Sequence, residues 1–204
     1  MRTILVTGFG PFPGAPYNPT AALVQRLARL RRPNLRLIGY VFPTEYAAVD
    51  RDLPRLVEQH RPDALLMFGL HGRARTLRIE TLARNAIGQH RDAGGAYAPA
   101  RAIAPGASHM KMATPAARLA RAARRTNVPA VISRDAGSYL CNYLCWQTTS
   151  MARPRLAAFV HVPPVVRKPL RKGASGLRSV TLERAATAIL TELSRCLGSA
   201  RKHA

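Results

Sequence analysis

Three residues of this 204-residue chain have side chains that could perform nucleophilic catalysis together. Cys141 lies one turn into a helix predicted over residues 138–152, where outward-pointing N–H groups help a thiol to lose its proton and could hold a developing oxyanion. His161 lies near the end of a strand predicted over residues 155–163 and could act as the base for a thiol. Glu80 lies in the largely apolar segment LRIETLA, where a carboxylate needs a partner such as an imidazole.

Each of these residues also fits an ordinary structural role. Free cysteine is most often a small buried hydrophobe, which is also what we expect of Cys145 and Cys196. His161 could be a hydrogen-bonded core histidine, and Glu80 could pair with an arginine. The other histidines are weaker candidates because they fall in predicted loops, helix ends or the tail. They are His60, His71, His90, His109 and His203.

The elements that must position these residues alternate between strand and helix. Buried strands are predicted over residues 3–9, 35–43, 63–69, 129–135 and 155–163. Helices are predicted over residues 19–32, 45–60, 114–125, 138–152 and 182–197. Residues 77–86 favour a strand, residues 89–113 are a long surface excursion, and Pro54 is expected to kink or break its helix.

This alternation predicts an α/β fold with crossover connections. We expect one three-layer α/β/α domain over residues 1–204, with a mostly parallel twisted sheet of the phosphorylase or hydrolase kind. Residues 199–204 are expected to form a flexible basic tail. The apolar start of the chain is interrupted by Gly8, Gly10 and Pro11, so it indicates a first strand rather than a signal peptide.

Composition restricts the class of protein. Apolar residues make up 47% of the chain and charged residues 21%, as in ordinary globular proteins. No apolar run is long enough for a membrane helix. The three cysteines are too few for a disulfide framework and show no zinc-site spacing, so we expect no metal and a reducing cytoplasm.

The chain is strongly basic, with 32 Lys and Arg against 10 Asp and Glu, a net charge of +22. Such an excess can mark a nucleic-acid-binding protein. The arginines are scattered along the chain, however, and aromatic residues make up only 6%, so no base-stacking surface is evident. An arginine-rich surface without a nucleic-acid partner explains the same composition.

The glycine-rich stretch GFGPFPG after the first strand matches neither the dinucleotide fingerprint nor the phosphate loop. Phe9 and Phe12 stand where those motifs need small residues. Two rings in a tight loop suit a small, flat, mostly apolar ligand, although ordinary core packing would also explain them.

Four segments together resemble the pyroglutamyl peptidase I family of cysteine peptidases, along nearly the whole chain. LVTGFGPFPGAPYNPT is similar to the family's V-T-G-F-x-P-F-G-G opening followed by N-P-S, and RIETLARN to its acidic motif. SRDAGSYLCNYLCW is similar to the nucleophile motif S-x-x-A-G-x-Y-x-C-N, and FVHVP to the histidine motif F-I-H-V-P.

The resemblance implies removal of an N-terminal pyroglutamyl residue through a thioester, without a metal or organic cofactor, by a protein that often forms dimers or tetramers. Cys141 would be the nucleophile, with its own N–H serving the oxyanion, His161 the base and Glu80 the residue that orients His161. Phe9 and Phe12 would line the lactam pocket.

The chain departs from the family at the pocket. The family's G-Q-A-G-G-R stretch begins here as Gly69-Leu70-His71-Gly72-Arg73, so Leu70 stands in place of the usual glutamine, and the resemblance implies an altered contact near the substrate pocket. His90 occupies a position where the family has arginine, and Arg91 follows one residue later. Arg91 is therefore a further candidate for substrate binding, and Asn18 of the opening motif is another. A related cysteine hydrolase with another small acyl or cyclic amide substrate, or a basic nucleic-acid-binding protein on the same scaffold, are the alternatives.

Overall fold

The computed structural model describes residues 1–98, 100–166 and 176–199. A central sheet is built from β1 (Arg2–Phe9), β2 (Leu35–Phe42), β3 (Ala64–Leu70), β4 (Leu77–Glu80), β7 (Ala130–Ser133) and β8 (Leu156–Val162). Their order is β2-β1-β3-β8-β4-β7. Neighbouring strands run parallel, apart from the antiparallel pair β4 and β8. The predicted α/β class with a mostly parallel sheet is therefore confirmed.

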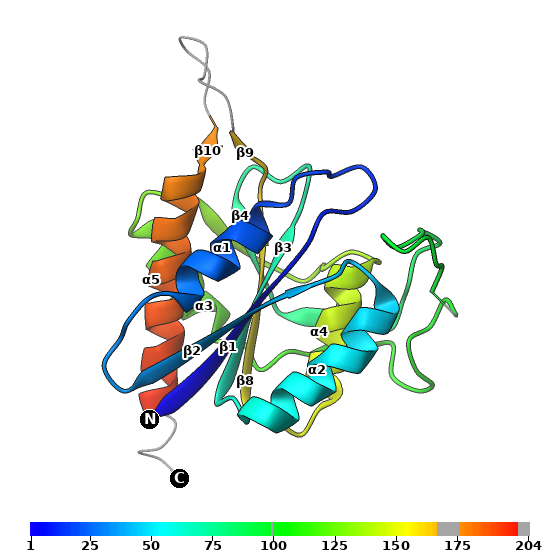
Figure 1. The fold of residues 1–204 in the computed structure, drawn as a ribbon, viewed down its shortest axis with the longest axis horizontal. Helices are drawn as coiled ribbons and strands as arrows, with labels where there is room; N and C mark the ends of the chain where they lie inside the picture. The colour runs from blue at the N-terminus through cyan, green and yellow to red at the C-terminus, as the bar shows by residue number, and fades with distance from the viewer. Residues whose placement is uncertain (99, 167–175, 200–204) are drawn as a thin grey trace.

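Helices cover both faces of this sheet, as the prediction of three layers requires. They are α1 (Pro19–Ala28), α2 (Tyr46–His60), α3 (Ala116–Arg124), α4 (Leu140–Ser150) and α5 (Ser179–Ser199). Figure 1 shows α1, α3 and α5 on one face and α2 and α4 on the other. Among the described residues, no helix is both long and apolar enough to cross a membrane.

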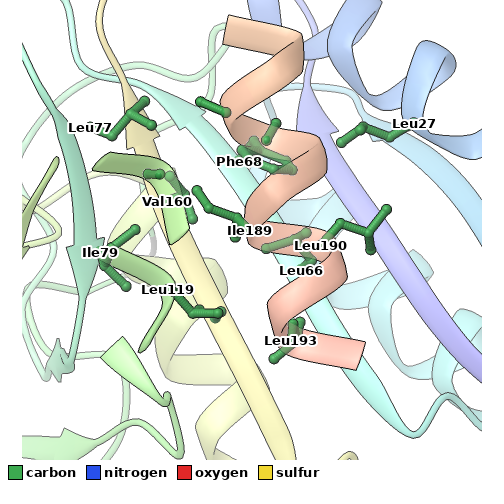
Figure 2. Packing of buried hydrophobic residues seen from close by; sticks show 14 of the residues in the cluster. Leu27, Leu66, Phe68, Leu77, Ile79, Leu119, Val160, Ile189, Leu190 and Leu193 are labelled. Carbon is green, nitrogen blue, oxygen red and sulfur yellow. The ribbon is translucent and has the colours of Figure 1, made fainter. Parts of the chain in front are cut away.

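Because both faces of the sheet are covered, the central strand β3 is apolar along its whole length, with the sequence ALLMFGL. Successive side chains point to opposite faces, so each central strand contributes to two cores. Phe68, Val160 and Ile79 pack beneath α3 and α5, where Ile189 and Leu119 meet them (Figure 2). The other core lies under α2 and α4 and includes the face on which the candidate residues stand.

Two short strand pairs lie outside the main sheet. β5 (Leu82–Arg84) pairs with β6 (His109–Lys111), and β9 (Val165–Val166) pairs with β10 (Leu177–Arg178). The strand predicted over residues 77–86 is thus confirmed in part, as the two short strands β4 and β5, with residues 85 and 86 outside them. Ser199 ends α5 rather than opening a tail, and residues 200–204 lie outside the described residues. The single domain predicted over the whole chain stays a prediction.

Of the kink or break expected at Pro54, the break is wrong, because α2 continues through this residue. A proline removes the hydrogen bond to the carbonyl four residues earlier, here that of Asp50. Both Asp50 and Pro54 lie on the exposed side of the helix, so water can bind the freed carbonyl. Val49, Leu53 and other apolar residues on the opposite side are buried and hold the helix against the sheet.

Candidate active site

The sheet register places the candidate residues on one face. In the antiparallel pair, Arg78 lies opposite His161, and Glu80 lies opposite Phe159. In the parallel pair of β3 and β8, Gly69 lies opposite His161. Cross-strand partners share a face, and so do residues two apart on a strand. All five positions therefore lie on the face covered by α2 and α4.

A buried imidazole and a buried carboxylate form the centre of this site. Nδ1 of His161 lies 2.9 Å from Oε1 of Glu80. Glu80 is fully buried, and His161 is only 3% exposed. The backbone N–H of Asp135 donates to Oε2 of Glu80 at 3.1 Å, and Nε of Arg78 lies 3.6 Å from Oε1. Both carboxylate oxygens thus have partners, as a buried charge requires.

The turn before α4 positions Cys141 over this face of the sheet. Gly137 has a φ of +81°, which favours glycine, and its N–H donates to Oδ1 of Asp135 at 3.0 Å. Cys141 is the second residue of α4, whose N-cap is Tyr139. Within the described part of the chain, no side chain caps this helix end. Its first N–H groups therefore point toward the site with their partial positive charge.

Asn142 fixes the first turn of α4 in place. This side chain is fully buried. Its Oδ1 accepts from the backbone N–H of Arg84 at 2.8 Å, and its Nδ2 donates to the carbonyls of Arg84 and Ala86 at 2.8 and 3.0 Å. These bonds tie the helix to β5, so the thiol of Cys141 has a defined position over the sheet.

The charges at the site favour the imidazolium form of His161. Burial by itself would lower the pKa of His161, but the negative charge and hydrogen bond of the Cys141 sulfur, and then those of the Glu80 carboxylate, outweigh it and raise the pKa to about 9. Because Nδ1 faces Glu80, Nε2 is the nitrogen left for the thiol. Cys145, by contrast, is fully buried, and burial raises its pKa well above the ordinary range, which fits the packing role predicted for it.

Cys141 and His161 open into a cavity of about 680 Å³ at the ends of β1, β3 and β8. The predicted residues Phe9, Phe12 and Leu70 line it. The remaining lining residues are Pro13, Gly14, Ala15, Pro16, Tyr17, Asn18, Thr44, His71, Gly72, Arg73, Ala136, Gly137, Ser138, Tyr139, Leu140 and Pro164. Four aromatic side chains, Phe9, Phe12, Tyr17 and Tyr139, and three prolines give this cavity much apolar surface, as in pockets for small apolar ligands.

The two further candidates have different positions. Asn18 lines the cavity, but its amide caps α1: it accepts from the N–H of Thr20 at 3.1 Å and donates to the carbonyl of Gly10 at 3.0 Å. Arg91 lies outside the cavity, in an adjoining depression, with its guanidinium 5.2 Å from the ring centre of Tyr97.

The structure adds residues that the sequence reasoning did not select. His71 was a weaker candidate because it falls in a loop, yet its ring centre lies 5.4 Å from that of His161. Tyr139 lines the cavity, and its hydroxyl donates to the carbonyl of Arg91 at 3.0 Å. The sequence signal for His71 is its position next to Leu70, and the signal for Tyr139 is its place within the nucleophile motif.

Gly69 is a further addition, because a side chain there would displace the thiol. A Cβ atom at this position would lie 2.6 Å from Cζ of Phe159 and 2.7 Å from Sγ of Cys141. We expect Gly69→Ala to lower kcat/KM about a hundredfold, since small misplacements of a reacting group have effects of that size. Overpacking should also lower the free energy of unfolding by about 1–3 kcal/mol.

Gly10→Ala is the matched control for this prediction, because the nearest atom to its added Cβ would be the carbonyl oxygen of Phe42 at 3.6 Å, an ordinary contact. Steady-state kinetics and thermal unfolding of both variants make the comparison. Equal kcat/KM for the two variants would show that Gly69 does not position the thiol.

The described residues contain no group of three or more His, Cys, Asp or Glu side chains that could hold a metal ion. What they do contain is a thiol at a helix N-terminus, an imidazole and a carboxylate around an apolar cavity. On an α/β sheet, this arrangement is that of a cysteine-type hydrolase.

The comparisons with known proteins identify the family. The sequence profile of the pyroglutamyl peptidase family matches residues 2–196, so the chain belongs to this family. The pyrrolidone-carboxylate peptidase of Thermococcus litoralis is 31% identical over 169 residues, covering 80% of this chain and 77% of that protein. Its counterpart in Pyrococcus furiosus is 30% identical over 179 residues, covering 85% and 86%.

Solved structures agree with this assignment. A mutant pyrrolidone carboxyl peptidase from Pyrococcus furiosus superposes with a TM-score of 0.83 at 26% identity, covering 96% of this chain and 99% of that one. The enzyme from Fervidobacterium islandicum shares the fold, with a TM-score of 0.85 at 24% identity over 96% and 99% of the chains. The predicted resemblance and fold are confirmed.

Proposed function

We propose that this protein removes an N-terminal pyroglutamyl residue from peptides, with Cys141 as nucleophile, His161 as base and acid, and Glu80 as the residue that orients His161. One observation carries the assignment of roles. Glu80 binds Nδ1 of His161 at 2.9 Å, while the thiol of Cys141 and His161 open together into an aromatic cavity. The family membership favours hydrolysis over nucleic-acid binding as the function of this scaffold.

Transfer of the thiol proton of Cys141 to Nε2 of His161 gives the thiolate–imidazolium pair that the charges of the site favour. In the first half of the reaction, this thiolate attacks the carbonyl carbon that follows the lactam ring. The negative charge that develops on the carbonyl oxygen faces the N–H groups at the start of α4, including that of Cys141. His161 then gives its proton to the departing nitrogen. The C–N bond breaks, the shortened peptide leaves, and a thioester remains on Cys141.

In the second half, water replaces the peptide as the partner of His161. The imidazole takes a proton from the water, and the oxygen attacks the thioester carbon. The C–S bond breaks, pyroglutamate leaves, and the proton returns from His161 to the thiolate. Glu80 keeps Nδ1 of the ring facing away from the thiol and offsets the positive charge in both halves.

The cavity supports a pyroglutamyl group at the reacting carbon. The lactam ring is small and flat, and Phe9 and Phe12 offer aromatic surface beside Cys141. Asn18 and Thr44 support this wall, since both donate to the carbonyl of Gly10 at 3.0 Å. Leu70 favours a second candidate, a cysteine hydrolase for another small acyl or cyclic amide group, because it adds apolar rather than amide surface to the cavity.

A panel of aminoacyl coumarin amides tests the proposal. The reduced protein should hydrolyse the pyroglutamyl amide and discriminate against the prolyl, alanyl, glutaminyl and glutamyl amides by at least about a hundredfold, because each of these carries a charged α-amine that is costly to bury against an apolar wall, whereas the lactam nitrogen is neutral. Faster turnover of another panel member would favour the second candidate. Absence of turnover of every amide would contradict both.

The proposal extends to the setting of the protein. A catalytic thiol must stay reduced, so we propose the cytoplasm as its compartment. The dimer or tetramer implied by the resemblance is part of the same proposal, and light scattering of the purified protein measures it directly.

A further inference from the structure

The turn that follows β3 forms the cavity wall beside His161. His71 and Arg73 both line the cavity. The ring of His71 stands nearly perpendicular to that of His161, at 89°, with 5.4 Å between their centres. The backbone N–H of His71 donates to the carbonyl of Val162 at 2.9 Å. This bond ties the turn to the strand that carries His161, so the two rings keep their relative position.

The proposed reaction determines which part of the substrate meets this wall. His161 must reach the nitrogen of the departing amine. The residue that carries this nitrogen therefore lies beside the cavity neighbours of His161, while the lactam ring lies against Phe9 and Phe12. His71 is such a neighbour, and Arg73 follows it on the same turn. The side chain that comes directly after the pyroglutamyl residue is expected to meet these two residues.

The charge of this wall is positive. None of the described residues that line the cavity is Asp or Glu, and Arg73 supplies its permanent positive charge. Within the described part of the chain, no acidic side chain pairs with Arg73. Burial, together with His161 and Arg78, lowers the pKa of His71, so its ring offers a neutral N–H.

We propose that His71 and Arg73 form a subsite that selects pyroglutamyl peptides with an acidic residue directly after the pyroglutamyl residue. A guanidinium group can bind a carboxylate through two parallel hydrogen bonds, and the ring of His71 can add a third donor. The net charge of +22 would also attract acidic peptides from a distance.

This proposal rests on the proposed function, and its experiment separates the two. We would compare kcat/KM for pyroglutamyl-Glu-, pyroglutamyl-Gln- and pyroglutamyl-Lys-peptides of otherwise equal sequence, beside the pyroglutamyl coumarin amide. The Glu peptide should exceed the Gln peptide about threefold to fivefold, as expected for an ion pair with an arginine that is exposed to solvent. The Lys peptide should be the slowest, and added salt should reduce the preference.

Two variants of the same turn test the residues. Arg73→Gln should bring the ratio of the Glu to the Gln peptide close to one. Arg75→Gln is the matched control, because Arg75 is likewise exposed and lies in the same loop between β3 and β4 but does not line the cavity, and it should keep the ratio of the unmodified protein. Since each ratio is taken within one variant, a general loss of catalytic rate does not affect it.

The outcomes are distinct. Equal rates on the Glu and Gln peptides, with turnover of the coumarin amide, would overturn the subsite and leave the proposed function intact. A preference that survives in Arg73→Gln would also overturn it. Absence of turnover of the coumarin amide and of all three peptides would overturn the proposed function, and the subsite with it.

Discussion

Cys141→Ala is expected to lower the hydrolysis of pyroglutamyl amides by about ten-thousandfold or more, as removal of a nucleophile does in other hydrolases that form acyl intermediates. The reason is that no other thiol reaches the site: Cys145 and Cys196 are both buried in the core. The fold should persist, because Cys141 is only partly buried and its replacement removes one atom. Steady-state kinetics and thermal unfolding measure the two effects.

Cys145→Ala is the control for this prediction. It removes a thiol four residues away on the same helix, and its cost should appear as a loss of about 1 kcal/mol in the free energy of unfolding, with turnover retained. Alkylation at neutral pH should label Cys141 in the unmodified protein and leave Cys145 and Cys196 unlabelled in the folded state. Turnover of the amide by pure Cys141→Ala protein would contradict the assignment of the nucleophile.

The strands and the order Glu80, Cys141, His161 could be predicted from the sequence because their signals are local. Buried strands are apolar runs, and the three chemical residues stand in short motifs with specific neighbours. The reversal of direction between β8 and β4 could not be predicted in this way, since it depends on pairing between segments about 80 residues apart. That reversal places Glu80 diagonally across from His161 on one face.

Residues that act through close packing were hardest to predict. Gly69 ends an apolar run and has no chemistry of its own, and its role appears only once Cys141 and Phe159 stand above it. The position of His71 beside His161 could not be predicted for a related reason. A residue in a loop carries no local signal of which strand the loop will contact. The bond from His71 to Val162, residues 91 positions apart in the chain, supplies that missing information.

Glu80→Gln is expected to lower kcat about a thousandfold to ten-thousandfold, because the amide reverses the hydrogen bond to His161. A carboxylate accepts from Nδ1 and leaves Nε2 free to take the thiol proton. An amide that donates to Nδ1 would instead favour the tautomer that carries its proton on Nε2, which cannot act as a base. Binding of the substrate should change little, since Glu80 does not line the cavity.

The pH profile distinguishes this role of Glu80 from a purely structural one. The negative charge of Glu80 contributes to raising the pKa of His161 to about 9, so its removal should lower that pKa. The alkaline limb of the activity profile, where the imidazolium form is lost, should therefore move to lower pH in Glu80→Gln.

Glu192→Gln is the matched control. Glu192 lies on α5, on the opposite face of the sheet from the site, and its buried carboxylate accepts a hydrogen bond from Nε of Arg118 at 2.7 Å. Its loss should lower stability without moving the limb. An unchanged limb in Glu80→Gln, or a shift to higher pH, would show that Glu80 does not set the charge of the catalytic ring.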